Sequence, residues 1–310
     1  MEIEITKEKS SAISVLRVLA TISIVLCHYQ QAFHDKWAWV FNIGVQVFFV
    51  LSGYLYGHKE ITNWGGYFLK RLIKLYIPLY VLSTIALLAI EYLSETPVGL
   101  FNYLKAGGVD GLNHLWFMKA IAICYIITPI LQFFRKYVAA TFVFLCVIGA
   151  VEYIYLQRNL FTFSWLFLYA MGYYYPQLSV TFRRVAWTIL SLIVIVLTLN
   201  ISWTEILNYD GVYNRCWHDL MGMLICISFI PLIGLFNISK MPVVIKWMDK
   251  NSFYLYLTHH IYLVGPLSFV LFIPNASLCV AVTLLLILLS SVLLAIVSEL
   301  IINRLFVYIK

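Results

Sequence analysis

The chain has 310 residues, of which 63% are hydrophobic and only 11% are charged, and its formal net charge is +7. A soluble globular domain has about a quarter of its residues charged, so this composition excludes an ordinary soluble protein and predicts an all-α, polytopic membrane protein. The basic residues occur in small groups between apolar runs, which is typical of topology signals and does not indicate nucleic-acid binding.

About ten apolar runs of spanning length follow one another along the chain. They are residues 12–33, 41–57, 72–94, 114–134, 138–157, 161–177, 185–202, 217–236, 252–272 and 277–302. The first run has no small-residue cleavage site and is followed directly by further spans, which predicts a retained helix. No sizeable hydrophilic stretch interrupts the series, so we expect one integral-membrane domain over residues 1–310 and no separate soluble domain.

Lysine and arginine predict the orientation of these spans. With the N-terminus in the cytoplasm, fifteen of the 21 basic residues fall inside and Arg17 lies within the first span. The remaining five fall outside: Lys36, Lys105, Lys119, Arg158 and Arg215. This bias follows the positive-inside rule and predicts that both termini are cytoplasmic. The longest breaks, 95–113 and 203–216, are predicted outer loops.

Two ionisable residues, Arg17 and His28, stand out inside the first apolar run. Eleven residues are almost three helical turns, so both side chains should leave the same face of the helix, about 16 Å apart along its axis. Ionisable groups in hydrocarbon are costly and usually face a cavity or a site. The predicted topology places Arg17 near the cytoplasmic end and His28 further toward the outer face.

Five segments carry a family resemblance. They are Arg17 and His28 with ten residues between them, GVQVFFVLSGYL (44–55), FLKRLIKLYIPLY (68–80), HLWFM (114–118) and SFYLYLTH (252–259). In this order, over nearly the whole chain, they resemble the motifs of the integral-membrane acyltransferase-3 family, bacterial enzymes that O-acylate surface glycans. Two departures stand out: Gln46 replaces the family's usual acid, and two of the three basic positions in the third motif are lysine.

The resemblance implies catalytic roles for His28 and Arg17. Acyl transfer from a thioester to a hydroxyl needs a base, because an alcohol is a poor nucleophile at neutral pH, and imidazole titrates in the right range. His28 is expected to act as that base or to carry the acyl group transiently. The alternative is a buried histidine bonded to a neighbouring helix. Arg17 is expected to contact the donor or orient the site, and the alternative is a side chain that snorkels to the headgroups.

The basic cluster Lys70, Arg71 and Lys74 lies on the predicted cytoplasmic side, where acyl-CoA is available. The phosphates of coenzyme A suit such a patch, so the cluster is a predicted donor-binding site. The alternative is a topology signal in contact with anionic lipid.

The remaining residues in matched motifs are candidates for supporting roles: Ser52, His114, Trp116, Tyr256 and His259. Each has a structural alternative, namely close helix packing for Ser52 with Gly53, an interfacial position for Trp116, and hydrogen bonding for the histidines. His259 is expected about a third of the way up a helix that rises from the cytoplasm. The acids that could orient His28 are Asp35, Glu91, Glu152, Asp219 and Glu299.

The six cysteines include no C-x-x-C pair, so neither a zinc site nor a disulfide framework is predicted. We therefore expect a multi-pass O-acyltransferase of the bacterial inner membrane, with no bound metal or cofactor. It would use acetyl-CoA as co-substrate and acylate a sugar hydroxyl of a cell-surface or lipid-linked polysaccharide. The main alternative is a transporter or flippase for a lipid-linked glycan, although the sequence shows no inverted repeat. A third is a catalytically silent relative, which Gln46 suggests. Oligomeric state has no signature in the sequence.

Overall fold

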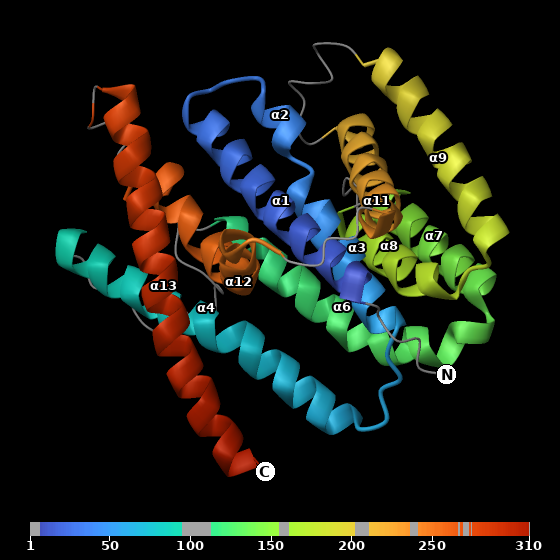
Figure 1. Ribbon diagram of the computed structural model, residues 1–310, viewed down its shortest axis with the longest axis horizontal. Helices are drawn as coiled ribbons and strands as arrows, with labels where there is room; N and C mark the ends of the chain where they lie inside the picture. Colours follow the sequence, from blue (N-terminus) through green and yellow to red (C-terminus); the bar gives the residue numbers. More distant parts are fainter. Residues whose placement is uncertain are drawn as a thin grey trace.

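The computed structural model describes residues 7–94, 113–154, 161–201, 211–235, 241–265, 267–268, 273 and 275–309. These residues form an all-helical bundle (Figure 1). The helices are α1 (Lys7–Ala32), α2 (Ala38–Phe41), α3 (Gly44–Gly57), α4 (Trp64–Ser94), α6 (Trp116–Phe133), α7 (Val138–Ile154), α8 (Phe161–Tyr174), α9 (Val180–Leu199), α11 (Val212–Leu235), α12 (Val243–Leu263) and α13 (Ala276–Ile309). Short 3-10 turns lie at Asn113–Leu115 (η1), Phe134–Lys136 (η2) and Tyr175–Gln177 (η3).

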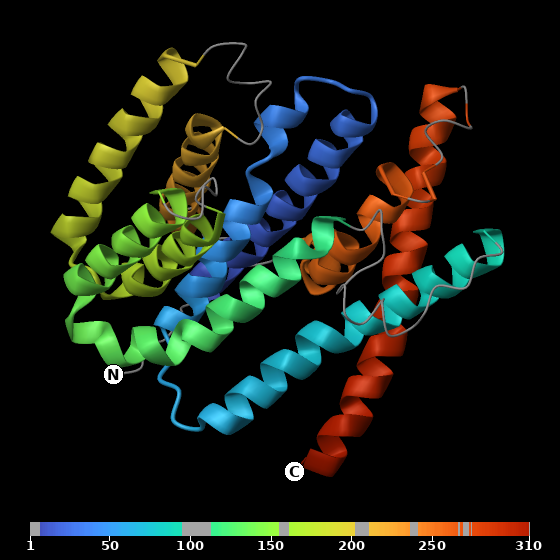
Figure 2. The same ribbon diagram turned by 180° about the vertical axis from the view of Figure 1, so that it is seen from behind.

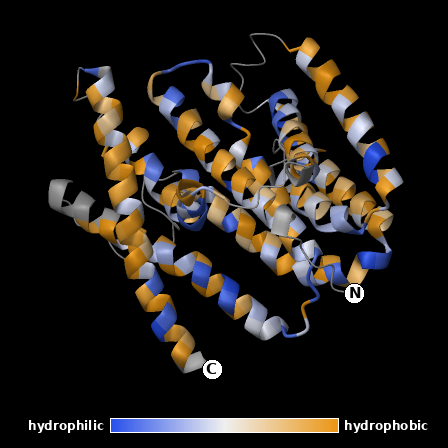
Figure 3. Ribbon diagram, in the orientation of Figure 1, coloured by the Kyte–Doolittle hydropathy of each residue, from blue (hydrophilic) through white to orange (hydrophobic). Residues whose placement is uncertain are grey.

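Six stretches of the described chain are long and apolar enough to cross a membrane, so the protein is a multi-pass membrane protein. They are Ser10–Ala32, Ala38–Gly57, Trp116–Lys136, Val180–Leu199, Val212–Leu232 and Ser277–Val307. Apolar residues predominate along α9 and α13, which lie at opposite edges of the bundle (Figures 2 and 3). The all-α prediction is confirmed, whereas ten spans remains a prediction.

Several predicted boundaries are wrong, because hydropathy marks the apolar part of a helix and not its ends. Helix α4 begins at Trp64 rather than residue 72, and α12 runs from Val243 to Leu263 rather than over 252–272. Helix α13 continues to Ile309, and α11 begins at Val212, inside a predicted loop. Lysine and arginine are good helix formers, so basic segments extend helices beyond their apolar cores. The predicted loop residues 95–112 and 203–210, with Lys105 and Arg158, lie outside the described residues.

The tightest packing in the bundle joins α3 and α8. A Cβ on Gly53 would lie 2.0 Å from the carbonyl oxygen of Tyr169, and one on Gly172 would lie 2.0 Å from that of Val50. Only glycine allows two helix backbones to approach this closely, which is the usual role of small residues in membrane helices. The structural reading of Gly53 is therefore confirmed, and the contact fixes α3 as the centre of the bundle.

Basic side chains gather at one end of the bundle. Arg135, at the end of α6, donates a 2.6 Å hydrogen bond to the Lys59 carbonyl after α3 and a 3.0 Å bond to the Tyr173 hydroxyl near the end of α8. Lys250 of α12 lies 3.8 Å from Glu299 of α13. We call this the basic end. At the opposite end, the Trp39 indole donates a 2.6 Å hydrogen bond to Asn214 at the start of α11.

Candidate active site

His28 lies four residues before the end of α1, away from the basic end, and is partly exposed. Its Nδ1 is 2.7 Å from Oε1 of Gln31, one turn further along the same helix. An amide oxygen can only accept, so this contact selects the tautomer in which Nδ1 carries the proton. Nε2 then keeps a free lone pair, which is what a general base requires. Sequence reasoning missed Gln31, although its i+3 spacing was a readable signal.

Three further histidine rings surround His28. The His28 ring centroid is 5.1 Å from that of His259 and 4.8 Å from that of His260, both on α12. The ring of His114 stacks on that of His260 at 4.4 Å and lies 5.3 Å from that of His259. We call these four residues the histidine cluster. All but His28 are buried, so His28 is its accessible member.

Two of the buried rings are fixed by backbone hydrogen bonds and keep one free nitrogen. His259 Nδ1 is 2.6 Å from the Tyr256 carbonyl oxygen, and His114 Nε2 is 3.1 Å from that of Leu257. A carbonyl only accepts, so both of these nitrogens are N–H donors. Within the described residues, His259 Nε2 and His114 Nδ1 are buried and have no hydrogen-bond partner. The cluster therefore presents two unused acceptor nitrogens near His28.

The predicted position of His259 is wrong. Since α12 begins at Val243, His259 lies four residues before its last residue, Leu263, and not a third of the way along it. This places it beside His28, near the corresponding end of α1. His260 was missed because it lies outside the matched motif. Adjacent helical residues differ in direction by about 100°, so both could contact a group that packs between them.

Arg17 forms a two-pronged ion pair with Asp249 of α12. Arg17 Nε is 2.9 Å from Oδ1, and Nη2 donates to Oδ2 over 3.1 Å. The prediction that Arg17 and His28 share one face of the first helix is confirmed, because both contact α12. Asp249 had escaped notice, since it precedes the apolar run that was taken as the span. The arginine is thus held in place by a partner inside the protein.

A cavity of about 670 Å³ opens beside Arg17 at the basic end. Its charged lining residues are Arg17, Lys59, Arg71, Lys74, Lys250 and Glu299. Arg71 and Lys74 come from the predicted donor-binding cluster, and the Arg71 guanidinium lies 5.0 Å from the centre of the Tyr56 ring. Lys70 is exposed and does not line the cavity. The cavity therefore has a size typical of ligand pockets and an excess of positive charge.

Tyr256 and Phe117 separate this cavity from the histidine cluster. Both line the cavity, and their ring centroids are 5.2 Å apart. The Tyr256 ring is 5.6 Å from that of His114 and 5.7 Å from that of His259, and its hydroxyl donates to the His114 carbonyl. The predicted supporting residue Tyr256 therefore connects the two regions, and Phe117 is an additional wall residue.

The other predicted residues have structural surroundings. Trp116 packs on Trp165 of α8 at 4.7 Å between ring centroids, so it is a packing residue rather than a wall of the cavity. Ser52 lines the cavity, as does Tyr125 of α6. No histidine is among the described residues that line the cavity, so Ser52 is not assigned as a nucleophile. Gln46 is buried against Gly222 of α11, away from the histidine cluster.

Three of the acids considered for His28 have other partners. Asp219 accepts a hydrogen bond from Ser164, Asp35 accepts one from the Trp37 backbone, and Glu299 pairs with Lys250. None of these three contacts involves His28, whose Nδ1 is hydrogen-bonded to Gln31, so an acid partner for His28 stays a prediction. The Glu91 side chain lies outside the described residues. Across the described part of the chain, no three His, Cys, Asp or Glu side chains are arranged to hold a metal ion.

Comparison with known proteins gives one match. The acyltransferase domain family known as acyltransferase 3 matches residues 10–301, from the first turn of α1 to the later part of α13. No curated protein and no solved structure matches the chain.

Proposed function

The chain belongs to the acyltransferase 3 family of membrane acyltransferases, and from this membership we propose that it transfers an acetyl group from acetyl-CoA to a sugar hydroxyl of a cell-surface or lipid-linked polysaccharide. The observation that carries the proposal is the arrangement of a histidine cluster directly behind a positively charged cavity. Acyl transfer from a CoA thioester needs both parts, a base at the reacting carbonyl and cations for the donor's phosphates.

The donor would occupy the cavity at the basic end. Arg71 and Lys74 on α4, with Lys59 and Lys250 at the rim, supply charge for the phosphates of coenzyme A. Arg17 is already paired with Asp249, so it offers the donor no unpaired charge. The ion pair instead holds the guanidinium in one orientation. The pantetheine arm would run from this end toward Tyr256.

The acceptor would meet the donor at His28. In the proposed step, His28 Nε2 takes the proton of the sugar hydroxyl while the oxygen of that hydroxyl attacks the carbonyl carbon of the thioester. The C–S bond then breaks, the new ester C–O bond remains, and the CoA thiolate leaves and is protonated by the imidazolium. Gln31 holds the imidazole in the tautomer that this step requires.

The separation between the two ends suits a long donor and a short acyl group. Arg17 and His28 are about 16 Å apart along α1, a distance that the extended arm of coenzyme A can bridge. Phe117 and Tyr256 line the cavity with their rings 5.2 Å apart, and Tyr256 also contacts the histidines, so we expect these two rings to limit the length of the acyl chain. This favours acetyl over longer groups.

The membrane arrangement proposed with this function has ten spans and both termini in the cytoplasm of a bacterial inner membrane. The gathering of Arg135, Lys59, Arg71, Lys74 and Lys250 at one end supports a cytoplasmic location for that end, by the positive-inside rule. Acetyl-CoA is then available at the cavity, and the glycan approaches His28 from the other side.

Purified protein in proteoliposomes, given radiolabelled acetyl-CoA and a polysaccharide acceptor, tests the proposal. His28→Ala should lower the transfer rate by at least about 100-fold, since a positioned base contributes 10²–10⁴-fold. His34→Asn is the matched control, because His34 lies in the turn after α1 with a φ of 53°, which asparagine tolerates. Normal transfer by a folded His28→Ala protein would refute the mechanism. Export of a glycan that gains no acyl mass would instead support the transporter alternative.

A further inference from the structure

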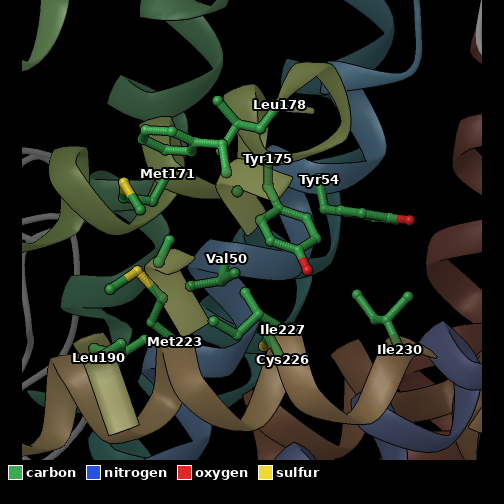
Figure 4. Close-up of a pocket in the computed structure, with 13 residues that line it drawn as sticks. Val50, Tyr54, Met171, Tyr175, Leu178, Leu190, Met223, Cys226, Ile227 and Ile230 are labelled. Carbon is green, nitrogen blue, oxygen red and sulfur yellow. The ribbon is translucent and has the colours of Figure 1, made fainter. Parts of the chain in front are cut away.

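A second, smaller hollow lies on the other side of α3 from the donor cavity. It has a volume of about 70 Å³ and is formed where α3, α8, η3, α9 and α11 meet (Figure 4). Val50 and Tyr54 come from α3, Met171 from α8, Tyr175 from η3, and Met223 from α11. We call it the apolar groove. None of the proposed catalytic or donor-binding residues lines it.

The lining of the apolar groove is hydrocarbon, thioether and aromatic ring. Its only side-chain oxygens are the hydroxyls of Tyr54 and Tyr175. Ile227 and Ile230 on α11 continue the apolar surface along one wall. Such a surface offers few hydrogen-bonding groups to a sugar or a nucleotide, so it suits a hydrocarbon chain.

Helix α9 lies between the groove and the surrounding lipid. Only Leu190 and Val194 of this helix are buried, while Ile189, Leu192 and Ile193 are exposed. Helix α9 lies at the edge of the bundle, with its outer face unoccupied by any other described helix (Figures 1 and 2). In a membrane protein this face contacts acyl chains, so lipid surrounds the helix that forms one wall of the groove.

A cation stands at the end of the groove nearest the basic end. The Arg183 guanidinium lies 5.6 Å from the centre of the Tyr175 ring, one of the groove's own lining residues. Arg183 Nε is buried and, within the described residues, has no hydrogen-bond partner. Burying a guanidinium N–H without a hydrogen-bond acceptor costs free energy, and an anionic oxygen is the acceptor that binds it most strongly.

From this combination we propose that the apolar groove and Arg183 form a binding site for one anionic phospholipid. A few methylenes of one acyl chain lie in the groove, and the phosphate accepts hydrogen bonds from Arg183. Basic pockets between membrane helices on the cytoplasmic side are recognised sites for such headgroups. The groove's charged end lies beside the end of α8, where Tyr173 meets Arg135, so the lipid belongs to the leaflet at the basic end. A lipid-linked glycan approaching from the opposite side would not meet Arg183.

The test uses the purified full chain in detergent, with phosphatidylglycerol and phosphatidylcholine of equal chain length as probes. Native mass spectrometry counts retained lipid, and thermal unfolding measures stabilisation. Phosphatidylglycerol should be retained and should raise Tm, whereas phosphatidylcholine should be retained about fivefold less, as expected for one surface cation. Equal retention of the two lipids would overturn the proposal.

Two neighbouring arginines provide a matched pair of variants. Arg183→Gln should lower phosphatidylglycerol retention about fivefold, while Arg184→Gln, which loses the same charge from an exposed side chain, should leave it unchanged. Equal loss in both variants would show a diffuse charge effect and refute the site. If Arg183→Gln does not fold, Arg183→Lys should fold and retain more phosphatidylglycerol than phosphatidylcholine.

A third variant tests the position of the acyl chain. Ala186→Trp, which fills the groove, should also reduce lipid retention, and unchanged retention in this variant would refute the acyl-chain position.

Discussion

The histidine cluster and the cavity at the basic end accommodate ionisable groups in opposite ways. In the cluster, neutral rings are buried, and the hydrogen bonds of their nitrogens described above go to backbone carbonyls or to an amide oxygen. In the cavity, permanent cations line an open volume of about 670 Å³ and need access to water or to an anionic ligand. An imidazole can be neutral at physiological pH, whereas arginine and lysine keep their charge, so only the histidines can be buried without counter-ions.

The same two helices build both regions. Helix α1 supplies Arg17 to the cavity and His28 to the cluster, and α12 supplies Asp249 and His259 opposite them. Enzyme kinetics should therefore distinguish the two regions. Substitutions in the cluster should lower kcat, and substitutions in the cavity should raise KM for acetyl-CoA.

Of the substitutions that test this separation of kcat from KM, Gln31→Ala should have the largest effect. Gln31→Ala removes the acceptor that fixes the His28 tautomer, so the transfer rate should fall about 100-fold with little change in KM for acetyl-CoA. Steady-state kinetics in proteoliposomes measure both constants. Gln30→Ala is the control, because the Gln30 backbone carbonyl, which this substitution keeps, accepts the hydrogen bonds from Phe33 and Asp35. A rise in KM with unchanged kcat would reverse the assignment of the two regions.

Arg17 should give the next largest effect, and on the other constant. Arg17→Gln leaves the Asp249 carboxylate without its ion-pair partner beside the cavity. The unpaired carboxylate then repels the donor's phosphates, so KM for acetyl-CoA should rise about tenfold. The double variant Arg17→Gln, Asp249→Asn should recover part of that loss, which a double-mutant cycle measures. Purely additive effects would show that the ion pair is not what positions Arg17.

Helix α4 offers a smaller and more selective test. Lys74→Gln should raise KM for acetyl-CoA about fivefold, since one cation near a phosphate is removed, while kcat stays within about twofold. Lys70→Gln removes the same charge from an exposed side chain that does not line the cavity, and should change neither constant. Both effects should weaken as salt rises. Equal effects of the two variants would indicate only a diffuse surface potential.

The smallest expected change concerns the wall between the regions. Phe117→Leu shortens the side chain that meets Tyr256, so the ratio of butyryl to acetyl transfer should rise about tenfold, the low end of the effect of one methylene in an apolar pocket. Phe48→Leu, also on the cavity lining, is the comparison variant. A butyryl-to-acetyl ratio that stays constant in Phe117→Leu would place the length limit elsewhere.

Much of the site could be predicted from spacing along single helices. The helical repeat alone placed Arg17 and His28 on one face, and both do contact α12. The motifs drew attention to Tyr256 and His259, which meet at the cluster. Helical spacing does not separate Lys70 from Lys74, because residues four apart share a face of the helix. Only the packing around α4 leaves Lys70 off the cavity lining while Arg71 and Lys74 line it.

The partners of these residues could not be predicted, because they come from other helices. Asp249 lies 232 positions from Arg17 in the chain, and its role depends on α12 beginning earlier than its apolar run. His260 carries no motif, and only the packing of α1 against α12 brings it to His28. Gln46 occupied the place of an expected acid, yet packing directs it toward Gly222 and away from the cluster.

The sequence by itself determined that this is an all-α, multi-pass membrane protein with a polar stripe on its first helix, because composition and helical periodicity are local properties. Only the tertiary structure decided that the stripe serves two different regions. The cavity and the cluster exist because α1, α4, α6 and α12 converge, and convergence depends on side-chain shape and close glycine contacts summed over the bundle. No single segment encodes it.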